Sequence, residues 1–188
     1  MNIIKNEIEG ILVIEPDFFP DKRGFFLESY NKKKYDDAGL KFNFVQDNIS
    51  KSQKGTIRGL HYQVGNNAQG KLCQVITGAV LDVAVDIRFA SPTFGKYFSV
   101  ELTSDNHKQV WIPTGFAHGF SVLEDDTIFS YKCTAFYNKR DERSILFNDE
   151  DLNIDWKVDK PNVSEKDLVA KRFKDIEKDF IIRVKSLQ

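Results

Sequence analysis

The sequence lacks the features that mark membrane, secreted or nucleic-acid-binding proteins. Its 188 residues hold 27 Lys and Arg against 28 Asp and Glu, and a formal net charge of −1 favours no polyanionic or membrane partner. Residues 1–8 mix apolar and charged side chains without the apolar core of a signal peptide, and no run approaches membrane-spanning length. We therefore expect a cytoplasmic protein that binds neither nucleic acid nor membrane.

Sulfur-containing residues are scarce as well. The two cysteines, Cys73 and Cys133, stand alone in strand-like runs, so we expect two buried thiols rather than a disulfide. A single methionine against 16 Phe and 6 Tyr favours a β-sheet protein over a helix bundle. With 41% hydrophobic and 29% charged residues, the chain suits one globular domain spanning residues 1–188.

Short alternating runs dominate the chain. In Leu81–Arg88 the apolar side chains fall at odd positions and the charged ones at even positions, which predicts a strand with one buried face. Similar runs, separated by turn signals, occur at residues 11–14, 24–29, 42–49, 71–76, 97–102, 110–112 and 127–133. This pattern predicts an all-β sandwich or barrel.

Helical periodicity is limited to two places. Residues 31–38, closed by Gly39, predict one short helix. Near the end, Phe173, Ile176 and Phe180 would share one helical face, so we expect a helical extension over residues 171–188.

Two of only three histidines lie in short segments punctuated by glycine. Residues 113–118 read Pro-x-Gly-x-x-His, which resembles the second sequence motif of the cupin barrels. Residues 58–63 stand where a metal-binding cupin would have two histidines and a glutamate, but only His61 remains. This arrangement resembles a cupin site without its metal, and it indicates acid–base chemistry.

A histidine in a strand is most often a packed core residue, but His61 has cationic neighbours. Arg58 and Lys71 are expected nearby, and a core rarely gathers cations without an anionic ligand. Strict alternation would put Arg58 and His61 on opposite faces of the strand, unless Gly59 forms a bulge that turns both inward.

A metal site is the rival interpretation, and it needs three or four ligands. The third histidine, His107, lies in a Ser-Asp-Asn turn where we expect it to be exposed. Asp82 or Asp86 could complete a site, but no ligand spacing supports one. We therefore predict that no metal is bound.

Other polar residues have ordinary structural interpretations when taken singly. Arg58 and Lys71 could be strand-edge charges, and Arg23 could be a solvated turn residue. Tyr131 and Tyr137 could be amphipathic wall residues.

The segment 164–167 reads most simply as a helix N-terminus, with Ser164 as the cap and Asp167 completing a box-like pattern.

Taken together, several segments resemble the dTDP-4-dehydrorhamnose 3,5-epimerase family from about residue 10 to residue 168. The segments that carry the resemblance are residues 21–28, 46–50, 58–63, 69–72, 82–88, 91–95, 111–120, 131–134, 154–156 and 164–167. The resemblance implies a cupin, or jelly-roll, β-barrel (a double-stranded β-helix) with short peripheral helices. It also implies a homodimer that acts without a cofactor on a dTDP-linked 4-keto-6-deoxyhexose.

The C4 ketone of such a substrate acidifies C3 and C5, because each carbanion delocalises into an enolate. A site must supply a base, a charge for the enolate oxygen, and an acid on the opposite face of the sugar ring. The resemblance assigns His61 as the base, Asp167 as its orienting carboxylate, Lys71 as the partner of the enolate oxygen and Tyr131 as the acid.

The resemblance also assigns the residues that bind the substrate. It implies diphosphate and sugar contacts for Arg23, Arg58 and Lys166, and thymine stacking for Tyr137. Other substrate-lining positions are Glu28, Gln46, Asn48, His118 and Glu142. Family members exchange an N-terminal strand between subunits, so Arg23 and Glu28 are expected to serve the neighbouring site.

The preferred hypothesis is a 3,5-epimerase on the path to dTDP-L-rhamnose and the polysaccharides built from it. One alternative is an epimerase that inverts only C3, or one that takes another nucleotide-linked 4-keto sugar. A second alternative is a non-catalytic sugar-binding cupin, and a third is a metal-dependent cupin oxygenase or isomerase.

Overall fold

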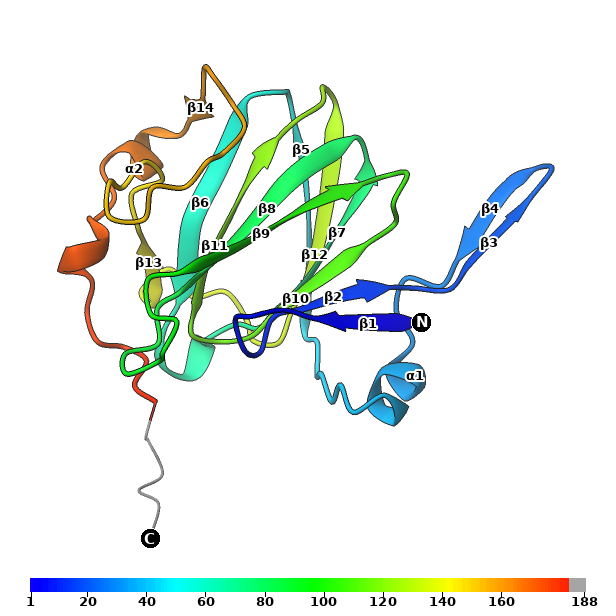
Figure 1. The fold of residues 1–188 in the computed structure, drawn as a ribbon, viewed down its shortest axis with the longest axis horizontal. Helices are drawn as coiled ribbons and strands as arrows, with labels where there is room; N and C mark the ends of the chain where they lie inside the picture. Colours follow the sequence, from blue (N-terminus) through cyan, green and yellow to red (C-terminus); the bar gives the residue numbers. More distant parts are fainter. Residues whose placement is uncertain (183–188) are drawn as a thin grey trace, which may run out of the picture.

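The computed structural model describes residues 1–182, and two six-stranded β-sheets pack face to face within them (Figure 1). The first sheet has the order β1 (Asn2–Lys5), β2 (Leu12–Glu15), β10 (Gln109–Ile112), β7 (Lys71–Thr77), β12 (Thr127–Cys133) and β5 (Gln46–Ser52). The second has the order β13 (Glu142–Ser144), β6 (Thr56–Gln63), β11 (Phe116–Val122), β8 (Ala79–Asp86) and β9 (Tyr97–Thr103), with β14 (Asn162–Val163) beside β6.

Helices are short and peripheral in the described residues. They are α1 (Lys32–Asp37), α2 (Glu165–Leu168) and 3-10 turns at Gly65–Asn67 and Phe173–Asp175. The predicted all-β jelly-roll fold with short peripheral helices is confirmed. Across residues 1–182, none of the helices is long and apolar enough to cross a membrane.

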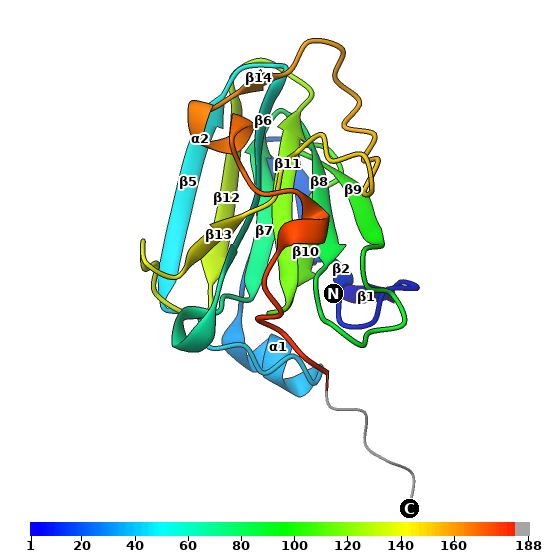
Figure 2. The ribbon, with the colours of Figure 1, turned by 90° about the vertical axis from the view of Figure 1, so that its left-hand side faces the viewer.

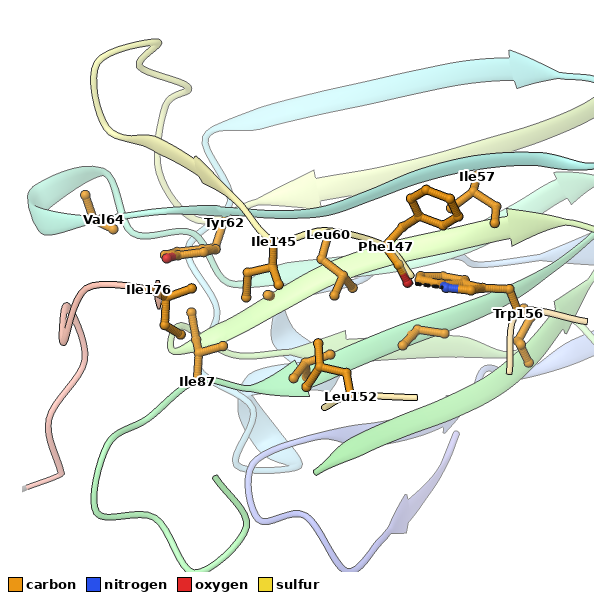
Figure 3. Packing of buried hydrophobic residues seen from close by; sticks show 14 residues of the cluster. Ile57, Leu60, Tyr62, Val64, Ile87, Ile145, Phe147, Leu152, Trp156 and Ile176 are labelled. Carbon is orange, nitrogen blue, oxygen red and sulfur yellow. Dashed lines mark hydrogen bonds between the residues drawn. The ribbon is translucent and has the colours of Figure 1, made fainter. Parts of the chain in front are cut away.

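The inner strand β8, which lies between β11 and β9, is buried on both faces, whereas its alternation predicted a single buried face. Leu81 and Val83 pack into a cluster on the outer side of the second sheet, and Val80 and Ala84 pack between the sheets. Asp82 is also buried. Later parts of the chain cover the outer side, where Figure 3 shows Trp156 and Phe147 over the sheet.

The C-terminal helical extension predicted over residues 171–188 is wrong for the part that the structure describes. Apart from the 3-10 turn Phe173–Asp175, residues 171–182 run extended along the second sheet (Figure 2). The amide of Phe89 donates to the carbonyl of Phe180 (2.8 Å), and Ile182 donates to Phe89 (3.0 Å). These bonds and the burial of Ile176 outweigh the local helical pattern. Residues 183–188 of the predicted helix lie outside the described residues.

A hairpin of β3 (Phe18–Asp21) and β4 (Gly24–Leu27) projects from the barrel as an arm (Figure 1). Its phenylalanines are largely exposed. His107 was expected to be solvent-exposed, but its ring is half-buried and stacks on Phe18 with 4.3 Å between ring centroids. The apolar surface of the arm explains this difference.

The strand predicted over residues 42–49 begins only at Gln46. Phe42 instead packs against Tyr35 and Trp111 in a separate aromatic cluster at α1, with a stacked Trp111 ring at 3.8 Å. The two cysteines, Cys73 and Cys133, are free and buried, as predicted.

The bulge predicted at Gly59 is present. His61 pairs with His118 and Arg58 pairs with Phe120, so three steps along β6 match two steps along β11. Gly59 adopts a φ of +126°, which L-residues with side chains rarely adopt. As a result, Arg58 and His61 line the same cavity.

We predict that Gly59→Ala destabilises the protein severely. A Cβ atom there would lie 2.5 Å from the Cα of Gly119 and 2.8 Å from the carbonyl oxygen of His118. Both are backbone atoms of strand β11, which cannot shift without disturbing its pairing with the neighbouring strands. The expected loss is about 3 kcal/mol or more in the free energy of unfolding, measured by denaturant titration.

Gly39→Ala is the matched control, because Gly39 also has a positive φ (+83°) but a Cβ there would meet nothing within 4 Å. Its expected cost is about 1 kcal/mol, from backbone strain alone. Equal losses for the two variants would contradict the importance of the close approach of the two strands.

Candidate active site

A cavity of about 420 Å³ opens between the two sheets, close to α2. Strands of both sheets line it, and the segment from β14 to α2 closes one side. Its lining residues are Ile49, Ser50, Thr56, Ile57, Arg58, His61, Lys71, His118, Phe120, Tyr131, Asn162, Val163, Ser164, Lys166 and Asp167.

His61 and Asp167 meet in this cavity although 106 positions separate them in the sequence. The Nε2 atom of His61 lies 2.6 Å from Oδ1 of Asp167, and the amide of Gly59 donates to Oδ2 at 3.5 Å. Ser164 caps α2 by accepting a bond from the amide of Asp167 (3.2 Å). The N-cap interpretation of this segment is therefore confirmed, and Asp167 also lies where the resemblance expects the partner of His61. Its role as an orienting carboxylate stays a prediction.

The pairing lowers the pKa of Asp167 and selects the tautomer of a neutral His61 ring. Burial by itself raises the pKa of Asp167, but the bonds from His61, Ser164 and Gly59 outweigh it and leave this pKa below its usual value. A carboxylate only accepts hydrogen bonds, so Nε2 of His61 carries the proton and Nδ1 keeps a free lone pair. The imidazole is thus arranged as a base, with 30% of its side chain exposed.

Lys71 and Tyr131 lie opposite His61, on β7 and β12 of the first sheet. The Nζ atom of Lys71 lies 5.9 Å from the centre of the Tyr131 ring. Burial raises the pKa of Tyr131 to about 12, so the phenol keeps its proton at neutral pH. The cavity therefore has the imidazole of His61 on one wall and the phenol of Tyr131 with the amine of Lys71 on the other.

His118 and Asp82 form a second histidine–carboxylate pair, and sequence reasoning had considered Asp82 only as a possible metal ligand. Nε2 of His118 lies 2.9 Å from Oδ2 of Asp82 and 3.9 Å from Sγ of Cys73. Burial lowers the pKa of His118 although Asp82 acts in the opposite direction, so the imidazole is neutral. Cross-strand pairing places His118 beside His61.

Within the described residues, Cys73, Asp82 and His118 form a group with ligand atoms all within 4.8 Å of one another. The direct bond between His118 and Asp82 gives each of these side chains a hydrogen-bond partner without an ion. Absence of a metal from the reaction stays a prediction, tested below by chelation.

Arg58 occupies the end of the cavity near Ser52. Its Nε and Nη2 atoms donate to the Ser52 hydroxyl at 3.2 and 3.1 Å. In the part of the chain that the structure describes, neither Arg58 nor Lys71 forms an ion pair with a carboxylate. Two uncompensated cations in one cavity indicate an anionic ligand.

Five of the predicted binding residues form a hydrogen-bonded chain beside the cavity, here called the rim, and of the five only Lys166 is among the residues that line the cavity. Gln46 donates to Asn48 (3.0 Å) and accepts from the amide of Tyr137 (2.9 Å). The Tyr137 hydroxyl donates to Glu142 (3.1 Å), which also binds Lys166 (2.6 Å). Burial alone would raise the pKa of Glu142, but the Lys166 bond outweighs it and keeps the carboxylate charged.

Arg23 and Glu28 are not brought to the cavity of their own chain. Arg23 is on the arm and pairs with Asp21 (2.6 Å), and Glu28 pairs with Lys34 (2.8 Å). Figure 1 shows the arm pointing away from α2 and β14. Their assignment to a neighbouring subunit's site stays a prediction.

Comparison with known proteins agrees with the geometry. The sequence profile of the family described as dTDP-4-dehydrorhamnose 3,5-epimerase matches residues 5–175. A dTDP-4-dehydrorhamnose 3,5-epimerase from Shigella flexneri is 54% identical over 176 residues, covering 93% of this chain and 97% of that protein.

Solved structures agree as well. The dTDP-6-deoxy-D-glucose-3,5-epimerase of Legionella pneumophila Philadelphia 1, in complex with dTDP-4-keto-L-rhamnose, superposes with a TM-score of 0.93 at 46% identity, covering 97% and 99% of the two chains. The dTDP-4-dehydrorhamnose 3,5-epimerase of Elizabethkingia anophelis NUHP1 gives 0.89 at 50% identity, covering 96% and 99%. The chain therefore belongs to the dTDP-4-dehydrorhamnose 3,5-epimerase family.

Proposed function

We propose that the protein inverts C3 and C5 of dTDP-4-dehydro-6-deoxy-D-glucose to give dTDP-4-dehydro-L-rhamnose, without a cofactor. The observation that carries this proposal is the position of His61 and Tyr131 on opposite sheets around one cavity. The complex of the Legionella relative with dTDP-4-keto-L-rhamnose supports the same class of ligand here.

The reaction begins with proton transfer from the substrate to His61. Nδ1 removes the proton from C5 or C3, and the electron pair of that C–H bond moves into the C4 carbonyl to form an enolate. Asp167 stabilises the resulting imidazolium through its 2.6 Å bond. Each pKa unit between base and carbon acid costs about 1.4 kcal/mol, so the enolate needs its own stabilisation.

Lys71 is suited to that task. Its ammonium is a compact charge in a side chain that is only 9% exposed, where electrostatic attraction is stronger than in water. Tyr131 then gives its phenolic proton to the same carbon from the other face, and configuration inverts. His61 loses its proton to solvent and Tyr131 regains one before the second carbon reacts.

Substrate binding is assigned to the cationic end and to the rim. Arg58 is placed against the diphosphate, and Lys166, Glu142 and Gln46 against the sugar and the nucleoside. Tyr137 is half-exposed at the rim, where its ring could stack on the thymine. His118, buried and neutral, lies beside the reacting sugar.

The arm suggests a homodimer. Four of its residues are large apolar side chains that are 41–66% exposed: Phe18, Phe19, Phe25 and Phe26. They form two aromatic pairs on opposite faces of the hairpin, Phe18 with Phe25 and Phe19 with Phe26, and so much exposed apolar surface marks a protein interface. We propose that each arm crosses to the partner, where Arg23 and Glu28 complete the binding site.

The first test is turnover in heavy water. We expect the wild-type protein to incorporate deuterium at both C3 and C5 of the keto sugar, as read by NMR, and to keep full activity after exhaustive chelation. Deuterium at C3 alone would favour the C3-only epimerase, no deuterium would favour a sugar-binding protein, and loss of activity on chelation would favour a metalloenzyme.

In the His61→Ala variant, deuterium exchange at both carbons should fall by at least about 100-fold, because one base serves both. Exchange at C5 at the wild-type rate would contradict a single base.

Tyr131→Phe tests the acid. The ring and its packing remain, so abstraction by His61 and stabilisation by Lys71 should continue. We expect loss of inversion together with deuterium in unepimerised sugar, because the His61 proton exchanges and returns to the same face. If Tyr131 only packed in the wall of the cavity, loss of its hydroxyl would lower the free energy of unfolding by about 1 kcal/mol and would change turnover little. Near-normal epimerisation by Tyr131→Phe would therefore contradict the assignment of Tyr131 as the acid.

Mixed dimers test the exchanged arm. Arg23→Ala and His61→Ala chains, each impaired alone, are co-expressed with different tags. If Arg23 serves the partner's cavity, one site of each mixed dimer is complete, and a statistical mixture should recover about a quarter of wild-type activity. Mixed dimers that form, as shown by tandem purification, but recover nothing would refute the arrangement.

A further inference from the structure

Strand β5 presents a row of polar side chains to the barrel interior. Alternate residues of a strand point to one face and lie roughly 6.7 Å apart. The intervening residues of β5 are exposed, whereas the row is half-buried or buried. The row consists of Gln46, Asn48, Ser50 and Ser52.

Three members of this row are bonded within the protein. Gln46 bonds Asn48, Asn48 donates to Sγ of Cys133 (3.5 Å), and Ser52 accepts from Arg58. Ser50 differs from them. Among residues 1–182, its Oγ is the one buried side-chain nitrogen or oxygen without a hydrogen-bond partner.

An unbonded buried hydroxyl costs free energy, and protein structures almost always avoid it. Ser50 lines the same cavity as Arg58, His61 and Tyr131. Its hydroxyl has almost no accessible surface in the free protein, so it must rotate about the Cα–Cβ bond to reach a ligand in that cavity. An exception at this one position is explained if the partner of the hydroxyl belongs to the ligand. The cost in the free protein is then recovered on binding.

The position along the row identifies the ligand group. Tyr131 pairs with Asn48 across the strands, whereas Ser50 pairs with Phe129, one step nearer to Ser52. Ser52 holds the guanidinium of Arg58, so Ser50 stands between the proposed acid and the proposed diphosphate contact. A hydroxyl next to a cation is a suitable donor to an anionic oxygen, and such O–H···O⁻ bonds are short and strong.

We propose that Ser50 is a further substrate-binding residue, whose hydroxyl donates a hydrogen bond to a diphosphate oxygen that Arg58 also contacts. The proposal rests on the proposed function, since it assumes a nucleoside diphosphate in this cavity. It adds a neutral donor to a site otherwise described by its cations. In this proposal Ser50 contributes to the affinity for the nucleoside diphosphate and takes no part in proton transfer.

Calorimetry with dTDP tests the proposal. We expect Ser50→Ala to bind dTDP about tenfold more weakly than the wild type, and Ser50→Thr, which keeps the hydroxyl, to bind nearly as well as the wild type. Ser99→Ala is the matched control, because Ser99 is an exposed serine on strand β9. With the keto sugar, Ser50→Ala should raise KM about tenfold at unchanged kcat, as expected for a contact made equally in ground and transition states.

Unfolding of the ligand-free variants gives an independent readout. Ser50→Ala should be at least as stable as the wild type, because the substitution removes an unbonded buried group; lower stability would show that the hydroxyl is bonded within the protein and would overturn the proposal. Unchanged dTDP affinity in Ser50→Ala, or equal weakening in Ser50→Thr, would also overturn it. Failure of the proposed function itself would appear in the wild type, as an absence of dTDP binding and epimerisation.

Discussion

The carboxylate of Asp167 is the group on which the active-site geometry depends. It accepts hydrogen bonds from the ring of His61 and from the amide of Gly59. These bonds connect α2 to β6, and the bond from His61 also fixes the tautomer of the imidazole. The carboxylate is buried, and Ser164 holds the turn that carries it. Removing either partner would leave a buried polar group unsatisfied, which costs more than the bond itself contributes.

Around this pair, the face-to-face packing of the two sheets places chemical groups on opposite sides of one cavity. Inversion at carbon requires a base and an acid on opposite faces of the sugar, and the two sheets hold the proposed base and the proposed acid on opposite walls of the cavity. The bulge at Gly59 is needed as well, because strict alternation would turn Arg58 out of the cavity that holds His61. Burial then keeps Tyr131 protonated and strengthens the effect of Lys71 on a developing negative charge.

Several expectations failed where long-range contacts overrode a local pattern. Phe173, Ile176 and Phe180 have helical spacing, yet bonds to Phe89 hold their segment extended against the second sheet. Asp82 occupies a polar position of an alternating strand, which ordinarily predicts exposure. It is buried because His118, from the neighbouring strand, bonds it. Neither outcome can be read from nearby residues, since each depends on a partner more than thirty positions away.

The sequence by itself determined the all-β class, most strands, the short helix at α1, the family, and the types of residue that carry the chemistry. These follow from local alternation, turn residues and motif spacing, which act over a few positions. The resemblance assigned Asp167 to His61, but only the tertiary structure gave the 2.6 Å contact between them. Only the tertiary structure, too, decided that the rim residues Gln46 and Lys166 belong to one bonded chain, and that Ser50 alone in its row is unbonded in the described residues. Such facts depend on how distant strands meet, because hydrogen bonding and burial are properties of the packed chain.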